Sequence, residues 1–199
     1  MTYQGFAPFA LAGSATRRHC AAMTKSSDPA PSAASPSPGA PGPICLRLTS
    51  PEATAELAQQ LAQQLHPGDC LLLEGPIGAG KTHFARSLIQ SLMVQPEDVP
   101  SPTFTLVQTY DVPSGELWHA DLYRLSALEE IEELGLFEAF DAAICLIEWP
   151  DRLAELTPEH ALHLALSLDP AEEDCRHLSF SWSDAKWQTR MDEIAYDRS

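Results

Sequence analysis

One stretch of this sequence combines the residue types and the spacing that bind a nucleotide phosphate. The segment Gly75-Pro-Ile-Gly-Ala-Gly-Lys-Thr82 fits the pattern G-x-x-x-x-G-K-T. Glycines allow the backbone to fold tightly around an anion, so that successive N–H groups point at phosphate oxygens. In such a loop Lys81 reaches the terminal phosphates, and the Thr82 hydroxyl can bind a magnesium ion. The residues expected to hold the phosphates are Gly75, Gly78, Ala79, Gly80, Lys81 and Thr82.

The elements on either side of this loop are those that a phosphate loop requires. Cys70–Leu73 is a short apolar run typical of a strand, and the residues from His83 to about Met93 continue at helical spacing. The helix adds the positive end of its dipole to the loop. The sequence therefore predicts a site for a nucleoside triphosphate rather than an ordinary glycine-rich turn.

A phosphate site of this kind also needs a carboxylate at the end of a buried strand, which holds magnesium directly or through water. Glu148 follows the apolar run Ala143–Ile147, which has the length of a fully buried strand. Asp121 ends a strand expected over residues 116–122. Ligands of open α/β sheets bind at the carboxyl edge, where both acids are expected. Together with Lys81, these two carboxylates are the candidate catalytic residues.

Three further side chains are candidates for contact with the nucleotide. The proline-bounded loop Ser101-Pro102-Thr103 carries two hydroxyls and could close on the terminal phosphate, as nucleotide switch loops do. An ordinary connector explains its spacing equally well. Trp149 could pack beside the nucleotide or face a partner, although a tryptophan at a strand end is also a common core residue.

The remaining pattern predicts an α/β fold with a mixed sheet between helices. The phosphate-loop strand is buried, whereas two pairs of alternating runs joined by turns predict hairpins, hence antiparallel strands. A Thr49 or Ser50 cap predicts a helix from Pro51 to about Leu65. The other expected elements are a strand at 44–48, a hairpin of 104–110 with 116–122, a helix capped by Ser126 and ending at Gly135, a hairpin of 160–169 with 176–182, and a short helix from Ser183.

The first 43 residues differ in composition from the rest of the chain. Residues 26–43 contain six prolines, five serines, four alanines and two glycines, with a single charged residue. Such a segment has too little apolar side chain to offset the entropy of ordering, so we expect residues 1–43 to be disordered and 44–199 to form the domain. No basic residue precedes the weakly apolar run near the start, which argues against a secretory signal.

Cysteine spacing and hydropathy favour a cytoplasmic protein. The five cysteines are never closer than 25 residues and form no C-x-x-C, so neither a zinc site nor a redox site has a local signature. Cys70 and Cys145 lie in apolar runs and are expected to be small buried hydrophobes. No run approaches the roughly 18 apolar residues of a membrane span. We therefore expect a reducing compartment, meaning the cytoplasm, and no membrane.

The charge of the expected domain argues against direct binding of nucleic acid. The chain has 12 basic and 28 acidic side chains, of which nine basic and 27 acidic fall in residues 44–199, giving a formal −18 for that part. Nucleic-acid affinity comes largely from Lys and Arg that displace counterions. Any role in nucleic-acid chemistry is therefore expected to run through a protein partner.

At this point several motifs together carry a resemblance to a known family. They are Gly75–Thr82, Ser101-Pro-Thr-Phe-Thr-Leu-Val107, His119-Ala-Asp-Leu-Tyr-Arg-Leu125, Glu133-Leu-Gly135 and Ile147-Glu-Trp-Pro150. In this order and spacing they resemble the TsaE family, the bacterial ATPase of tRNA threonylcarbamoyladenosine synthesis. The resemblance spans about residues 44–170.

The resemblance implies a P-loop fold that binds ATP and Mg²⁺ and acts with a TsaB–TsaD pair, of which TsaD modifies tRNA. The family's metal ligands fall on Thr82 and Glu148, and Asp121 and Trp149 match further functional positions. Its nucleotide contact at the first helix falls loosely near Pro51–Thr54. The usual acidic second residue of the loop is replaced by Pro76.

Three other functions remain open from the residues. A small-molecule or nucleoside kinase would use the same loop, but it usually needs a lid with arginines, and the central region carries only Arg86, Arg124 and Arg152. A GTPase-like switch is disfavoured because no N-K-x-D guanine pattern occurs. An assembly factor with a structural nucleotide is the third. The histidines, His83 and His119 among them, form no cluster with ligand spacing.

Overall fold

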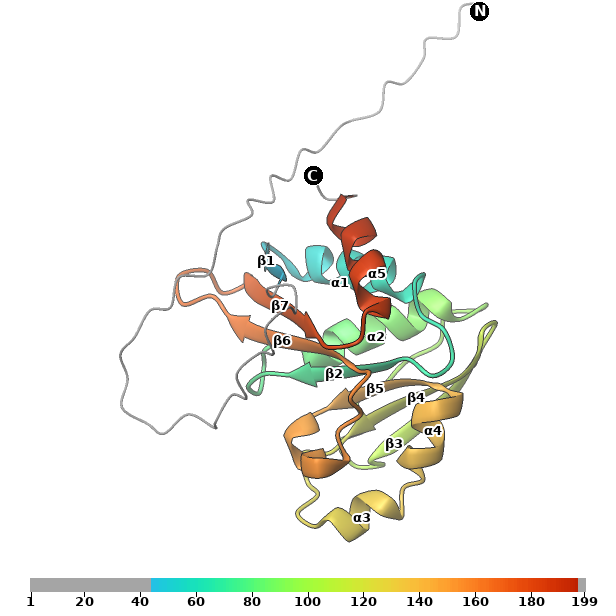
Figure 1. The fold of residues 1–199 in the computed structure, drawn as a ribbon. Helices are drawn as coiled ribbons and strands as arrows, with labels where there is room; N and C mark the ends of the chain where they lie inside the picture. The colour runs from blue at the N-terminus through green and yellow to red at the C-terminus, as the bar shows by residue number, and fades with distance from the viewer. Residues whose placement is uncertain (1–43, 197–199) are drawn as a thin grey trace, which may run out of the picture.

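A seven-stranded mixed sheet forms the centre of the fold, with the strand order β1-β7-β6-β2-β5-β4-β3 (Figure 1). The computed structural model describes residues 44–196, so the segment 1–43 that we expect to be disordered lies outside the described residues. The strands are β1 (Ile44–Leu48), β2 (Cys70–Glu74), β3 (Val107–Val112), β4 (Gly115–Asp121), β5 (Ile144–Glu148), β6 (Leu162–Leu168) and β7 (Arg176–Trp182).

The four central strands run parallel, and the sheet is completed by antiparallel strands at its two sides. β2 pairs with β5 and β6, and β4 pairs with β5, all in parallel. The antiparallel pairs are β3 with β4, β6 with β7 and β1 with β7. Cys70–Leu73 and Ile144–Ile147 are buried throughout, as expected for central strands that are covered on both faces. The predicted mixed sheet and both hairpins are confirmed.

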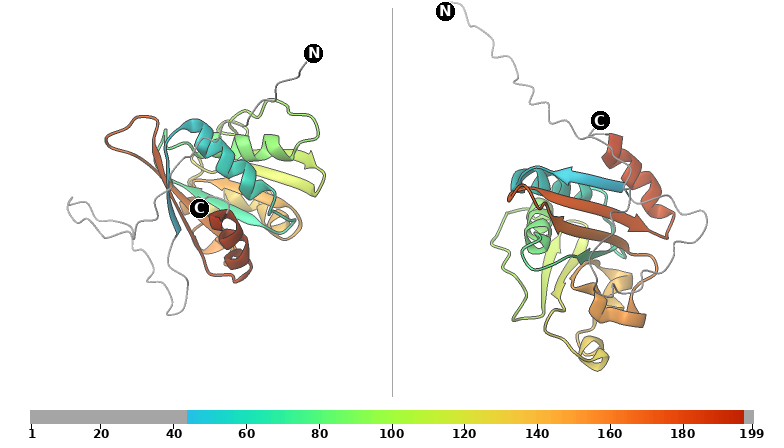
Figure 2. Two further views of the ribbon diagram at one scale, coloured as in Figure 1. Left: turned by 90° about the horizontal axis from the view of Figure 1, so that it is seen from above. Right: turned by 90° about the vertical axis from the view of Figure 1, so that its left-hand side faces the viewer.

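Helices cover both faces of this sheet (Figures 1 and 2). Leu71 and Leu73 belong to a core cluster with α1, α2 and α5, whereas Leu72 belongs to a second cluster with α3, α4 and η1. This alternation follows the two-residue period of a strand. The helices are α1 (Pro51–Ala62), α2 (Lys81–Leu92), α3 (Leu128–Glu132), α4 (Leu136–Ala142), α5 (Lys186–Tyr196) and the 3₁₀ helix η1 (Pro150–Leu156).

Helix α1 begins where the capping pattern predicts and ends slightly earlier than expected. Ser50 is the N-cap, because its Oγ accepts a hydrogen bond from the backbone N–H of Ala53 at 3.2 Å. At the other end Gln64 and Leu65 bond to carbonyls three residues earlier, so the last turn tightens out of α-helical geometry. The helix therefore stops at Ala62.

The strand expected at 104–110 begins three residues later, at Val107. The N–H of Leu106 bonds to the carbonyl of Pro102 at 2.6 Å, which closes a turn, and Leu106 has a φ of 66°. A strand cannot pass through this left-handed conformation. Residues 104–106 therefore form a turn that leads into β3.

The helix predicted from Ser126 to Gly135 is in fact the short helix α3, followed by a second helix that the sequence analysis missed. Ala127, not Ser126, is the N-cap, and the Glu130 carboxylate accepts hydrogen bonds from the N–H groups of both residues at 3.1 Å. Gly135 has a φ of 74° and precedes the first residue of α4. Its left-handed conformation, which costs glycine little, changes the chain direction between the two helices.

Helix α5 is attached to the start of β2 by polar and aromatic contacts. The buried Trp187 donates from Nε1 to the carbonyl of His160 at 2.8 Å. Lys186 Nζ lies 2.9 Å from Oδ1 of the buried Asp69, and Arg190 contacts the other carboxylate oxygen. Two cations thus neutralise an acid that lies far away in the sequence.

The two cysteines that lie in apolar runs are buried, as the sequence predicts. Cys70 and Cys145 are fully buried and free, and burial raises the pKa of the Cys145 thiol to about 12. Both therefore act as small apolar core residues. Within residues 44–196, no helix is long and apolar enough to cross a membrane.

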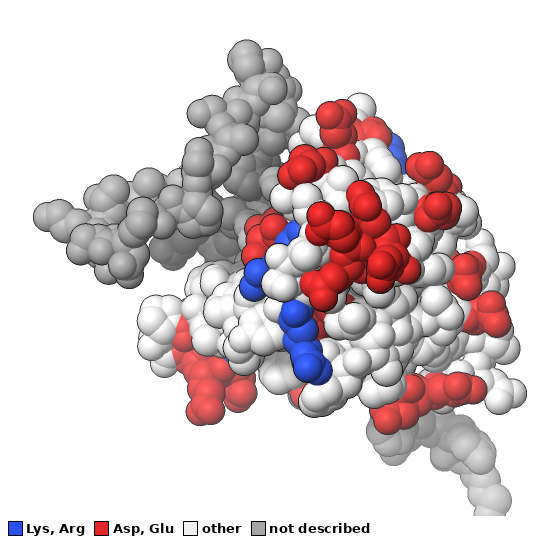
Figure 3. Space-filling view, turned by 90° about the horizontal axis from the view of Figure 1, so that it is seen from below, with Lys and Arg blue, Asp and Glu red and all other residues white. Residues whose placement is uncertain are grey.

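Acidic side chains dominate the surface that Figure 3 shows. They gather near the middle of this face, with only a few basic side chains beside them. This agrees with the formal net charge of −16 for the whole chain.

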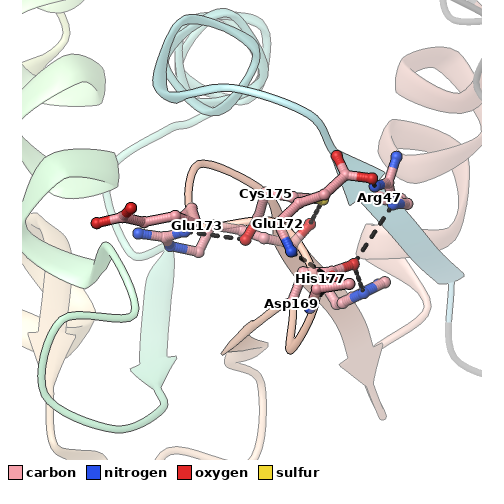
Figure 4. A network of polar contacts seen from close by, with 8 residues as sticks. Arg47, Asp169, Glu172, Glu173, Cys175 and His177 are labelled. Carbon is pink, nitrogen blue, oxygen red and sulfur yellow. Dashed lines mark hydrogen bonds and ion pairs between the residues drawn. The ribbon is translucent and has the colours of Figure 1, made fainter.

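A polar network holds the turn between β6 and β7 against β1 (Figure 4). Asp169 Oδ1 accepts hydrogen bonds from the backbone N–H groups of Ala171 and Glu172 at 2.8 and 3.2 Å. Its Oδ2 lies 2.9 Å from His177 Nε2 and 3.5 Å from Arg47 Nε. The pKa of Asp169 is lowered to about 2. The hydrogen bond from Ala171 is the largest cause, and the hydrogen bond with His177 contributes a smaller part.

This shift predicts a pH-dependent contribution to stability. The folded pKa of Asp169 is about 2 and the unfolded pKa is about 3.9, so the carboxylate stabilises the fold above pH 4, and this contribution is lost as the pH falls through about 2. We expect Asp169→Asn to lower the free energy of unfolding near pH 5 and the difference from the wild type to shrink toward pH 2. Urea unfolding at a series of pH values measures both.

The matched control is Asp174→Asn, which changes an exposed carboxylate of the same turn. It should follow the wild type at every pH. A deficit of Asp169→Asn that stayed constant down to pH 2 would contradict the shifted pKa.

Candidate nucleotide-binding site

The phosphate loop lies between the end of β2 and the start of α2, as the motif predicts. Helix α2 begins at Lys81 with Gly80 as its N-cap, and its first turn has neither a side-chain cap nor an acidic residue. Its first N–H groups therefore remain available, and the positive end of its dipole faces the loop. Both features attract an anion.

The first glycine of the loop is required by a close contact with the neighbouring strand. Gly75 has a φ of 135°, and a Cβ there would lie 2.2 Å from the backbone carbonyl oxygen of Leu166 in β6. Gly78 also has a positive φ, 81°, but a Cβ there would meet no atom within 4 Å. Glycine at position 75 therefore allows the loop to lie close against β6. At position 78 glycine is favoured only by the positive φ of the backbone.

The Lys81 side chain is folded back onto the loop. Its Nζ donates hydrogen bonds to the carbonyls of Gly75 at 2.7 Å and Pro76 at 3.0 Å, and it lies 4.0 Å from the centre of the Trp149 ring. Burial lowers the pKa of Lys81, and the nearby carboxylates of Glu148 and Asp121 oppose this shift. A bound phosphate would offer Nζ a charged acceptor in place of the two carbonyls.

Glu148 and Thr82 meet directly, although 66 residues separate them in the sequence. The Thr82 hydroxyl donates a hydrogen bond to Glu148 Oε2 at 2.9 Å. In-register pairing of β2 with β5 places Leu73 opposite Glu148, so the acid ends its strand beside the phosphate loop. Because the hydroxyl uses its proton for the carboxylate, the lone pairs of its oxygen remain free for a cation.

Asp121 connects the other candidate loop to the same sheet edge. It lies opposite Glu148 in the β4–β5 register and is buried. Its Oδ2 accepts a hydrogen bond from Thr103 Oγ1 at 2.8 Å, and its Oδ1 accepts one from the N–H of Tyr123 at 3.0 Å. Ser101 Oγ lies 2.7 Å from Thr103 Oγ1. The loop is therefore hydrogen-bonded to the strand end that carries Asp121.

Trp149 lies over the loop lysine in a strained backbone conformation. Its φ of 60° and ψ of 52° are left-handed, which costs a non-glycine residue about 1–2 kcal/mol. The N–H of Trp149 bonds to the carbonyl of Leu73 at 3.3 Å, and its ring centre lies 4.9 Å from that of Tyr123. The conformation turns the half-buried ring toward Lys81 and away from the core.

The structure adds His119, which the sequence analysis did not select. This fully buried residue of β4 lies two positions before Asp121, and its Nε2 is 3.0 Å from Glu148 Oε1. One signal could have found it: in a strand, residues two apart share a face, so a histidine two positions before a candidate acid faces the same side. Only the pairing of β4 with β5 reveals its partner.

The start of α1 also lies beside α2, since His83 Nε2 is 2.9 Å from the carbonyl of Pro51. The segment Pro51–Thr54, which the resemblance connects with the nucleotide, is therefore near the phosphate-loop helix. Its role and those of the other candidate residues stay predictions at this point.

The oxygen donors at this edge fit a magnesium ion better than a metal with nitrogen or sulfur ligands. In residues 44–196, no group of three or more His, Cys, Asp or Glu side chains could hold a metal by itself. Magnesium usually takes one or two protein oxygens and completes its shell with water and substrate phosphates. Thr82 and Glu148 supply such a pair of oxygens next to the phosphate loop.

The close contact at Gly75 leads to a prediction about stability. Gly75→Ala should lower the free energy of unfolding by clearly more than the roughly 1–2 kcal/mol of a left-handed alanine, because the methyl group also collides with backbone of β6. The control Gly78→Ala shares the positive φ and has open space. Urea denaturation measures the free energy of unfolding of both variants. Equal losses would show that the close approach of Gly75 to β6 does not add to the cost of the substitution.

Comparison with known proteins adds independent findings. A family model described as "Threonylcarbamoyl adenosine biosynthesis protein TsaE" matches residues 48–178, which include every candidate site residue. Two similar proteins are both described as tRNA threonylcarbamoyladenosine biosynthesis protein TsaE. The one from Rickettsia felis is 45% identical over 111 residues, covering 56% of this chain and 65% of that protein. The one from Bacillus subtilis is 34% identical over 150 residues, covering 75% and 92%.

A solved structure has a similar fold. The crystal structure of Bacillus subtilis YdiB matches with a TM-score of 0.62 and 28% identity, covering 79% of this chain and 97% of that one. The chain thus spans slightly less than two thirds of the Rickettsia felis relative, at 65%, and nearly all of the Bacillus subtilis relative, at 92%. The region that the family model matches, residues 48–178, contains the sheet edge with the phosphate loop. Helix α5 lies beyond this region.

Proposed function

Because this chain belongs to the TsaE family, we propose that it binds ATP with Mg²⁺, hydrolyses the ATP, and serves the formation of threonylcarbamoyladenosine in tRNA. The hydrogen bond between Thr82 and Glu148 carries the chemical part of this proposal. It joins the hydroxyl of the phosphate loop to a buried strand-end carboxylate, the two groups that a phosphoryl-transfer site needs around its metal.

Each side chain at the sheet edge has a task in this proposal. The N–H groups of the loop and of α2 bind the phosphates, and Lys81 exchanges its two carbonyl contacts for phosphate oxygens. Thr82 and Glu148 would hold Mg²⁺, which offsets the negative charge of the phosphates when it is bound. Asp121 keeps Thr103, and with it Ser101, next to the terminal phosphate position.

Trp149 and the identity of the base complete the proposal for the nucleotide. The half-buried ring of Trp149 lies 4.0 Å from Lys81 Nζ and can shield the phosphates from water. Adenine is favoured over guanine because the sequence lacks an N-K-x-D pattern. No feature of the described residues favours the kinase alternative.

We propose that the protein acts in the cytoplasm with a TsaB–TsaD-like pair and contacts tRNA only through that complex. Two observations support this part. The relatives are described as tRNA threonylcarbamoyladenosine biosynthesis proteins, yet the chain carries a formal −16. An acidic face such as that of Figure 3 repels the phosphate backbone of tRNA and suits a partner with basic surface.

Replacement of the loop lysine tests the nucleotide site. Lys81→Ala should weaken ATP binding at least tenfold and abolish turnover, because the loop loses its cation at the β and γ phosphates. Isothermal titration with ATP and Mg²⁺ measures the affinity, and circular dichroism checks the fold. The control Lys186→Ala removes a lysine of α5 that pairs with Asp69 at the start of β2, away from the loop. Equal ATP affinity in Lys81→Ala and the wild type would refute the site.

A tRNA titration tests the proposed partner. Labelled tRNA added to the protein alone should show no binding even at low salt, where phosphate attraction is strongest. With a TsaB–TsaD-like pair and ATP, a complex with tRNA should form, and its association should slow as salt rises. Tight, salt-sensitive binding of tRNA by the isolated protein would contradict the proposal that the protein contacts tRNA only through a partner complex.

A further inference from the structure

His119 is a buried polar residue whose only hydrogen-bond partner among the described residues is Glu148, the proposed metal ligand. It has no exposed surface, lies on β4, the second strand from one edge of the sheet, and faces the α2 side together with Leu117 of the same strand. Its Nε2 is 3.0 Å from Glu148 Oε1, whereas Nδ1 has no hydrogen-bond partner among the described residues. An apolar side chain would fill such a position without burying polar atoms, so packing alone does not explain a histidine here.

The two ring nitrogens of His119 can be assigned by their surroundings. A carboxylate accepts hydrogen bonds, so the nitrogen that faces Glu148 carries the proton. A neutral ring with its proton on Nδ1 instead would leave that buried N–H without an acceptor and Glu148 Oε1 without the donor from His119. The favoured form is therefore the tautomer with its proton on Nε2.

Both oxygens of Glu148 then have a donor from a different element. Oε1 accepts from His119 of β4, and Oε2 accepts from Thr82 of α2. With both oxygens engaged, the carboxylate cannot rotate without losing a hydrogen bond. His119 and Thr82 thus fix the orientation of the Glu148 carboxylate before a nucleotide binds.

We propose that His119 is a positioning residue: its Nε2–H holds the Glu148 carboxylate in the orientation that serves Thr82 and the metal. This inference rests on the proposed function, because it concerns the same carboxylate. Partners that orient metal-binding groups typically change metal affinity or activity by about 10–100-fold when they are removed. His119 would act through Glu148 and would not touch the nucleotide.

A matched pair of substitutions separates hydrogen bonding from packing. His119→Gln keeps an N–H donor at about the reach of Nε2, whereas His119→Met has a similar length and no donor. The control His177→Gln makes the same His-to-Gln change at another histidine–carboxylate contact, the one with Asp169 in the β6–β7 turn. For each variant, ATP turnover in the presence of the TsaB–TsaD-like pair gives kcat and KM, and thermal unfolding checks the fold.

We expect kcat of His119→Met to fall about 10–100-fold, with KM for ATP changed by less than about threefold and a higher Mg²⁺ concentration needed for half-maximal turnover. His119→Gln should recover most of kcat, and His177→Gln should match the wild type. Equal loss in the Gln and Met variants, or no loss in either, would overturn the inference.

Nuclear magnetic resonance of the wild type without nucleotide gives a readout that does not depend on activity. The imidazole ¹⁵N shifts of His119 should show a proton on Nε2, the nitrogen that faces Glu148. A proton on Nδ1 instead would overturn the inference, even if a variant failed to fold.

Glu148→Gln distinguishes failure of this inference from failure of the proposed function. If Glu148→Gln keeps full turnover, the proposed metal role of Glu148 fails, and the positioning role of His119 fails with it. If Glu148→Gln loses turnover while His119→Met does not, the proposed function stands and only the positioning role is overturned.

Discussion

The in-register parallel pairing of β2, β5 and β4 is the constraint on which the candidate site depends. Parallel strands end at a common edge, and here Leu73 lies opposite Glu148, which lies opposite Asp121. The phosphate loop leaves the sheet at the same edge. A shift of one residue in the β2–β5 pairing would turn Glu148 away from α2 and break its hydrogen bond with Thr82. The same shift of β4 against β5 would turn His119 and Asp121 to the other face of the sheet.

Each buried polar side chain at this edge has at least one hydrogen-bond partner among the described residues. Glu148, Asp121, Lys81 and His119 are all buried, and unpaired charges in such surroundings would be strongly destabilising. Each finds a partner in the described residues: Glu148 bonds to Thr82 and His119, Asp121 bonds to the 101–103 loop, and Lys81 bonds to the loop carbonyls. The site is therefore organised before a nucleotide binds. A bound phosphate would have to displace only the two backbone carbonyls that accept hydrogen bonds from Lys81.

Backbone strain is concentrated next to these groups. The three non-glycine residues with positive φ in the described part of the chain are Leu106, Trp149 and Ala154. Leu106 leads the 101–103 loop into β3, and its carbonyl accepts from the N–H of Asp121. Trp149 directly follows Glu148. Strain of this kind persists where surrounding contacts over-determine the chain, and it is common at binding sites.

The sequence by itself determined the features that rest on local spacing. The phosphate loop, the buried runs of β2 and β5, the two hairpins and the cap just before Pro51 all follow from residues within about twenty positions of one another. The family resemblance joined several such local motifs in their order, and the family match confirmed it. The same reasoning placed Thr82, Glu148 and Asp121 at one sheet edge, with Glu148 the preferred metal ligand and Asp121 the second candidate.

Only the tertiary structure decided the features that depend on residues far apart in the chain. The pairing of His119 with Glu148 requires β4 to lie beside β5, and the attachment of α5 requires Asp69 to meet Lys186 and Arg190. The later start of β3 and the second helix after Gly135 depend on backbone conformations at Leu106 and Gly135 that residue type alone did not reveal. Local propensity specifies where elements form. The contacts between elements decide which polar side chains meet.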